Sequence, residues 1–372
     1  MTASPARAWV ATRKGLFLVT RDPALEGIDV RGPWLAGYEV YHAAADPRRP
    51  ADALALANHP VWGAHVFRIG AADPSEARLL PGPEPGGGGP DPEALWHLAA
   101  PAAPDRDWYL GAAPAALFRT ADPDRGWTRI PSLDAHATRA AWHPAKGGLA
   151  LHSIQTDPRA AGRLYVAVSA GGCYRTDDGG TTWVPINRGI RAAYLPDPAA
   201  EAGHNPHALR LHPARPDRLY RQDHSGVYRS DDGGDTWDEI TGDLPSDFGY
   251  ALALDPGDPD RAWVVPERDS HMRCVCDARL RVFETRDAGR SWIARTAGLP
   301  QADAYVSVLR DALCAGASGL FLGTSTGQVY ASADGAGWRP APALFPPVLA
   351  IVDAGAADAR IGQIRTTAAA VV

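Results

Sequence analysis

The sequence is poor in lysine, methionine and cysteine, and it lacks a long hydrophobic run. Lys14 and Lys146 are the only lysines among 37 basic side chains, and 43 acidic residues give a net charge of −6. Such a chain is not expected to bind nucleic acid, which requires clustered basic side chains. No apolar segment is long enough to span a membrane or to act as a signal peptide. These absences predict a cytoplasmic protein that binds neither nucleic acid nor membranes.

The cysteine content also excludes a small disulfide-rich domain. Four cysteines without an export signal are expected to stay reduced. The 372 residues, of which 45% are hydrophobic, are enough for a large core. Glycine (38) and proline (34) are frequent, which favours many turns over long helices.

What the sequence does contain is a repeat. YRTDDGGTTW, YRSDDGGDTW and FETRDAGRSW end at Trp183, Trp237 and Trp292, and weaker copies end at Trp127 and Trp338. From the first tryptophan to the last the steps are 56, 54, 55 and 46 residues, a period typical of propeller blades. Each copy lies between two alternating apolar stretches, which predicts a tight turn between two strands.

The residues of the repeat suit such a turn. Asp232 is expected to accept backbone N–H bonds, Gly233 and Gly234 allow positive φ, and Trp237 covers the outer layer of the blade. The pattern S/T-x-D-x-G-x-T/S-W resembles the Asp-box of BNR-repeat propellers, which include sialidases. The resemblance implies that these boxes are structural and lie away from the central site. ATRKGLF, YEVYHA, LHSI and SDFGY are similar to a bacterial branch often labelled glycosyl hydrolase or sialidase-like, a label that does not imply activity.

The repeat also allows the blades to be counted. The N-terminus supplies three strands, in AWVAT, GLFLV and DVRGPW, and the C-terminal PPVLAIVDA supplies the fourth. Joining both ends in one blade removes the exposed sheet edges. The sequence therefore predicts an all-β, seven-bladed β-propeller with four-stranded blades, a single domain over residues 1–372. Six blades are expected to be complete: 38–85, 93–131, 149–188, 205–242, 248–297 and 303–341.

Four predicted inner strands begin at histidines spaced by 55 residues: His42, His97, His152 and His207. Inner strands line the channel of a propeller, so these imidazoles are predicted to bind a divalent transition metal, preferably iron, with zinc, copper or manganese as alternatives. The following proline lies at different distances from these histidines, so His42 and His97 need not share the orientation of the other two. In the alternative interpretation all four line the channel without metal and bond to neighbouring backbone.

Loops at the same face supply candidate catalytic residues. Arg139, Arg188 and Arg191 are predicted to bind an anionic group of a small-molecule substrate, and His224 or Glu267 to act as general base. The main hypothesis is a metal-dependent enzyme with redox, lyase or hydrolase chemistry.

Two alternatives remain: a sialidase-like glycoside hydrolase, and a non-catalytic scaffold that binds a glycan or a protein. A sialidase requires three arginines around a carboxylate, a Tyr–Glu nucleophile pair and an acidic Asp. Tyr250, Tyr305 and Glu267 have no matching sequence context for that pair. Substrate, metal and oligomeric state are not determined by the sequence.

Overall fold

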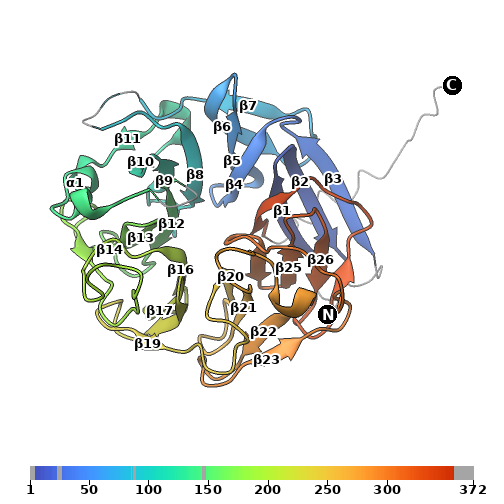
Figure 1. The fold of residues 1–372 in the computed structure, drawn as a ribbon. Coiled ribbons are helices and arrows are strands. Elements are labelled where there is room, and N and C mark those ends of the chain that lie inside the picture. The colour runs from blue at the N-terminus through green and yellow to red at the C-terminus, as the bar shows by residue number, and fades with distance from the viewer. Residues whose placement is uncertain (1–4, 23–26, 85, 87–88, 145–147, 356–372) are drawn as a thin grey trace.

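The computed structural model describes residues 5–22, 27–84, 86, 89–144 and 148–355. Its strands form seven antiparallel sheets of four strands each. Figure 1 shows these sheets as blades around a central axis, with β4, β8, β16 and β20 facing the axis. The predicted seven-bladed propeller is confirmed. The predicted domain boundaries include ranges, such as 356–372, that lie outside the described residues.

The blades follow the chain in order and are numbered here from the first complete one. Blade 1 consists of β4 (Glu39–Asp46), β5 (Arg49–His59), β6 (Gly63–Gly70) and β7 (Ala77–Leu80). Blade 2 consists of β8 (Ala94–Ala99), β9 (Trp108–Ala113), β10 (Ala116–Thr120) and β11 (Thr128–Arg129). Blade 3 consists of β12 (Leu151–Thr156), β13 (Leu164–Val168), β14 (Gly172–Thr176) and β15 (Val184–Pro185). Blade 4 consists of β16 (Pro206–His212), β17 (Arg215–Asp223), β18 (Gly226–Ser230) and β19 (Asp238–Glu239). Blade 5 consists of β20 (Gly249–Leu254), β21 (Ala262–Pro266), β22 (Val282–Thr285) and β23 (Ile293–Arg295). Blade 6 consists of β24 (Leu313–Gly316), β25 (Gly319–Gly323), β26 (Val329–Ser332) and β27 (Arg339–Pro340).

Blade 7 joins the two ends of the chain. It comprises β28 (Val348–Asp353), β1 (Ala6–Thr12), β2 (Gly15–Arg21) and β3 (Ile28–Trp34), in that order from the axis. The antiparallel pairing of β28 with β1 confirms the predicted closure. The described helices are one turn each: α1 (Pro131–Asp134) and the 3-10 helices η1 (Pro123–Arg125), η2 (Arg139–Ala141) and η3 (Cys276–Ala278). None of them is long and apolar enough to cross a membrane.

The Asp-box turns form as their residue types predict. Asp232 accepts bonds from the Ser230 hydroxyl at 2.7 Å and from the backbone and hydroxyl of Thr236 at 3.0 and 2.6 Å. The Trp237 indole N–H donates to the carbonyl of Ile186 in the preceding blade at 2.9 Å. The box therefore closes its own turn and also ties two blades together.

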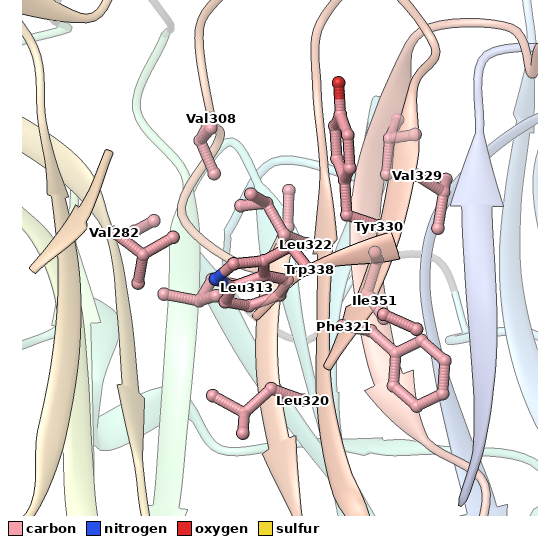
Figure 2. Packing of buried hydrophobic residues seen from close by; sticks show 14 of the residues in the cluster. Val282, Val308, Leu313, Leu320, Phe321, Leu322, Val329, Tyr330, Trp338 and Ile351 are labelled. Atoms are coloured by element: carbon pink, nitrogen blue, oxygen red, sulfur yellow. The ribbon is translucent and has the colours of Figure 1, made fainter. Parts of the chain in front are cut away.

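Apolar side chains fill the spaces between blades. Figure 2 shows one such cluster, to which Val282 of β22, Leu322 of β25 and Ile351 of β28 contribute from blades 5, 6 and 7. Trp338, which ends the last copy of the repeat, is buried in the same cluster. Close packing between neighbouring sheets makes the ring rigid, so side chains at the axis are held in fixed positions.

Candidate functional site

The inner strands of six blades have a β-bulge near their starts. In blades 1 to 5 and in blade 7 the pairing between first and second strand skips one residue, at Tyr41, Trp96, His152, His207, Tyr250 and Leu349. A bulge leaves the extra residue unpaired and re-aims its side chain. Five of the six, His152 being the exception, line one cavity at the face where the inner strands begin.

These bulges explain how the four predicted histidines are oriented. His152 and His207 are themselves the skipped residues, whereas His42 and His97 come one position later and pair with the second strand. Adjacent strand residues face opposite sides, so an equal spacing of 55 residues does not give an equal orientation. The four histidines therefore form two pairs with different surroundings.

His152 and His207 bond to the backbone of the following blade. His152 Nε2 lies 3.0 Å from the carbonyl oxygen of Pro206, and His207 Nδ1 lies 2.6 Å from that of Gly249. Burial lowers the pKa of His207 to about 3 and holds that of His152 well below its usual value, so both are neutral near pH 7. Hydrogen bonds to neighbouring backbone are what the alternative interpretation, channel-lining histidines without metal, predicts for these two residues.

His42 and His97 lie together with a carboxylate that the sequence analysis did not single out. Their ring centroids are 4.2 Å apart, and ligand atoms of His42, His97 and Asp311 all lie within 4.8 Å of one another. Burial lowers the pKa of His42 to about 3. Burial alone raises the pKa of Asp311, but Arg210, His97 and His42 outweigh it and hold that pKa well below its usual range. The predicted four-histidine set is thus divided, with two of its members beside an ionised carboxylate.

A large cavity lined by described residues opens beside these groups at the channel mouth. It has a volume of about 690 Å³. Its residues come from inner strands and from the loops at their starting edge. Aromatic and basic side chains dominate the lining: Arg13, Tyr41, Trp96, His207, His224, Phe248, Tyr250, His271, Arg273 and Arg310.

Two of the predicted catalytic residues belong to this region. His224 lines the cavity. Glu267 lies behind the wall, fully buried, and its Oε1 accepts bonds from the Ser307 hydroxyl at 2.6 Å and the Val308 N–H at 3.0 Å. Its Oε2 is buried without a hydrogen-bond partner among the described residues. Burial raises the pKa of Glu267 to about 7, so this carboxyl changes charge near neutral pH.

The three predicted substrate-binding arginines do not line the cavity. Arg191 forms ion pairs with Glu239 and Asp247 at 2.9 and 3.0 Å. Arg139 places its guanidinium 4.8 Å from the centre of the Trp142 ring, and Arg188 is exposed in a turn. They lie on the long 4→1 loops that the sequence analysis identified, but these loops turn their arginines elsewhere.

Three other arginines line the cavity: Arg13, Arg273 and Arg310. Arg310 donates from Nε to the His207 carbonyl at 3.0 Å, and its guanidinium carbon lies 5.9 Å from the centre of the Trp96 ring. Among the described residues, neither Arg310 nor Arg273 has a carboxylate within ion-pair distance, whereas Arg13 pairs with Glu39 at 3.0 Å. Each occupies a 2→3 or 4→1 connection, a position that the blade count alone identifies as facing the mouth.

The chain is similar to known proteins over part of its sequence and in its fold. No known family profile matches the sequence. A segment of 134 residues is 32% identical to the probable oligoxyloglucan-reducing end-specific xyloglucanase of Neosartorya fischeri, over 34% of this chain. The chain spans only 16% of the length of that relative.

Solved structures with the same fold include glycoside hydrolases. The GH74 enzyme of Niastella koreensis aligns over 94% of this chain and 69% of its own, with 13% identity and a TM-score of 0.51. YCF48 from Cyanidioschyzon merolae aligns over 83% of this chain and 87% of its own, also with 13% identity and a TM-score of 0.51. At these identities the likeness concerns the fold alone.

Proposed function

We propose that the mouth cavity binds glycosides of carboxylate-bearing sugars and hydrolyses them. The observation that carries the proposal is the cavity lining: aromatic rings together with the guanidinium groups of Arg310 and Arg273, which have no ion-pair partner among the described residues. Arginine binds carboxylates by paired charge-assisted hydrogen bonds. Aromatic faces pack on the apolar side of a sugar ring, and a volume of about 690 Å³ suits a mono- or disaccharide.

Tyr250 is the candidate nucleophile. It lines the cavity and stacks on His207 with ring centroids 4.5 Å apart. Burial raises the pKa of the Tyr250 phenol. The charges of Arg273 and Arg310 lower this pKa and that of Glu267 raises it, which means that the Glu267 carboxylate acts on the phenol electrostatically. In the proposed reaction the Tyr250 oxygen bonds to the anomeric carbon as the leaving group departs, and the phenolic proton passes to Glu267 by way of water, because no direct hydrogen bond joins the two side chains. Water then releases the sugar from Tyr250. Tyrosine nucleophiles are established for sialidases.

Xyloglucanase and GH74 relatives support a glycoside hydrolase at the level of the fold, and the proposal narrows this to acidic sugars because of the arginines. The metal-dependent redox hypothesis has no support from these relatives. Hydrolysis by this route requires a group with a pKa near neutral that acts on the nucleophile; the pKa of Glu267 is about 7, and its charge acts on the pKa of Tyr250.

The test uses fluorogenic aryl glycosides of sialic acid and glucuronic acid, with aryl glucoside and xyloside as neutral comparisons. An aryl group leaves as a phenolate, so turnover does not depend on which residue is the general acid. We expect turnover of an acidic glycoside only. Arg310→Met is expected to raise KM by roughly 10- to 100-fold, the cost of a hydrogen bond to a charged group, and Tyr250→Phe to abolish turnover.

Arg290→Met is the matched control, because Arg290 is exposed on an Asp-box turn away from the cavity. It should leave turnover unchanged. Binding of the free sugar acids by calorimetry separates the two halves of the proposal. Binding without hydrolysis would overturn the enzymatic half and favour a glycan-binding propeller, and the absence of both would overturn the whole proposal.

A further inference from the structure

A second site lies deeper in the channel, where three blades meet. His42 is on β4 of blade 1 and His97 on β8 of blade 2, and Asp311 precedes β24 of blade 6. Asp311 forms an isolated parallel bridge with Ala350 of β28, which fixes its backbone at the axis. All three side chains are more than nine-tenths buried. We propose that His42, His97 and Asp311 together bind one divalent transition-metal ion.

One imidazole nitrogen of this cluster has no hydrogen-bond partner among the described residues, and another has only a weak one. His97 Nδ1 is buried and has no hydrogen-bond partner among the described residues. His42 Nδ1 accepts only a long bond, 3.4 Å, from the Leu98 N–H. A buried polar atom without a partner costs free energy, and natural proteins leave few of them. A bound cation would satisfy the unpartnered nitrogen of His97.

The ligand atoms of the cluster also lie close to the spacing that a shared metal ion requires. His97 Nδ1 lies 3.9 Å from Asp311 Oδ2, too far for a direct hydrogen bond. Two donors that share an ion through bonds of about 2.1 Å lie roughly 3 to 3.5 Å apart. The 3.9 Å distance would therefore need to shorten by about 0.4 to 0.9 Å for the two atoms to share an ion, and no two of the three ligand atoms lie more than 4.8 Å apart.

The carboxylate of Asp311 is already held in one orientation by a neighbouring arginine. Its Oδ1 accepts a bond from Arg210 at 2.6 Å, which leaves Oδ2 toward the imidazoles. Metal-binding carboxylates are usually held in this way by a second hydrogen bond. Asp311 lines the mouth cavity, and it also lines a second cavity of about 290 Å³ that includes His42 and His97, so an ion has space to enter.

The donor set limits the choice of metal. Two imidazoles and one carboxylate suit Zn²⁺ or Fe²⁺ and are poor ligands for Ca²⁺ or Mg²⁺, which prefer oxygen. Three protein ligands leave coordination positions open. The ion would also link blades 1, 2 and 6 across the channel, so its binding should stabilise the fold. The proposal does not depend on hydrolysis at the mouth cavity.

The experiment uses the full chain, stripped with a chelator and then dialysed against Zn²⁺ or Co²⁺. Elemental analysis should find about one Zn²⁺ per chain, Co²⁺ should give ligand-field absorption bands, and Zn²⁺ should raise Tm. His97→Gln and Asp311→Asn should each weaken binding by at least about 100-fold. His152→Gln is the matched control: an equally buried inner-strand histidine outside the cluster, expected to keep the metal.

Wild-type protein that is folded but binds neither ion at near-stoichiometric amounts overturns the proposal. It is also overturned if His97→Gln keeps the metal, or if His152→Gln loses it while remaining folded. Because the wild-type measurement alone decides the first outcome, a ligand variant that fails to fold does not block the test.

Discussion

The buried carboxyl of Glu267 makes a prediction about stability as a function of pH. Burial raises its pKa in the folded protein to about 7, against 4.5 for the exposed group. The folded state therefore binds the proton more tightly than the unfolded chain. Stability from this group is complete below pH 4.5 and is lost as the pH rises through about 7. At about 1.4 kcal/mol for each pKa unit, the loss reaches roughly 3 kcal/mol at pH 8 and is under about 1 kcal/mol at pH 5.

Glu267→Gln resembles the protonated carboxyl and cannot ionise. Its Oε1 can still accept the bonds from Ser307 and Val308. We expect the variant to exceed the wild type in free energy of unfolding by about 2 to 3 kcal/mol more at pH 8 than at pH 5. The measurement is urea denaturation of both proteins at pH 5, 6, 7 and 8. A difference that is independent of pH, or larger in acid, would refute the reasoning.

Glu284→Gln provides a control of opposite sign. Burial alone raises the pKa of Glu284, but bonds from Arg261, Arg295 and Arg286 outweigh it and lower the pKa overall. Stability from Glu284 is therefore present above its unfolded pKa and lost as the pH falls. This variant should be destabilised at neutral pH, with a deficit that shrinks in acid.

Two predictions concern the fold. Asp232→Ala removes the acceptor that closes one Asp-box and should lower the free energy of unfolding by about 1 to 2 kcal/mol in urea denaturation; the exposed Asp238→Ala should change it by less than about 0.5 kcal/mol. Truncation after residue 346 removes β28, exposes the edge of β1 and should cause aggregation on size-exclusion chromatography. Truncation after residue 355 keeps β28, so the edge of β1 stays covered and aggregation from that edge is not expected; equal behaviour of the two truncations would contradict the closure argument.

The sequence predicted the blades because their information is local. Each of these hydrogen bonds in an Asp-box joins residues at most four positions apart, as Asp232 is bonded by Ser230 and by Thr236, so its chemistry is visible in ten residues of sequence. Repetition at a fixed period then gives the number of blades. The count also revealed which strand was missing from the N-terminal blade, and thereby the pairing of β28 with β1.

The sequence indicated which loops form the mouth of the channel, but it did not indicate which side chains line the cavity there. Counting blades identified the loops that form the mouth, and it brought His224 and Glu267 into consideration. It did not show that Arg191 would be held by Glu239 and Asp247, because those partners come from other loops. The direction of a long side chain depends on such partners, and spacing along the chain does not encode them.

What the sequence determined by itself is the propeller, since strands, turns and closure follow from short-range patterns repeated along the chain. The tertiary structure alone decided which side chains meet at the axis. The bulges at Tyr41 and Trp96 set the orientation of His42 and His97 through pairing with a second strand. Asp311 reaches His97 across more than 200 residues of sequence because closure of the ring brings blade 6 opposite blades 1 and 2. Contacts across a channel depend on ring closure and strand register together, and neither is visible in the residues that make the contact.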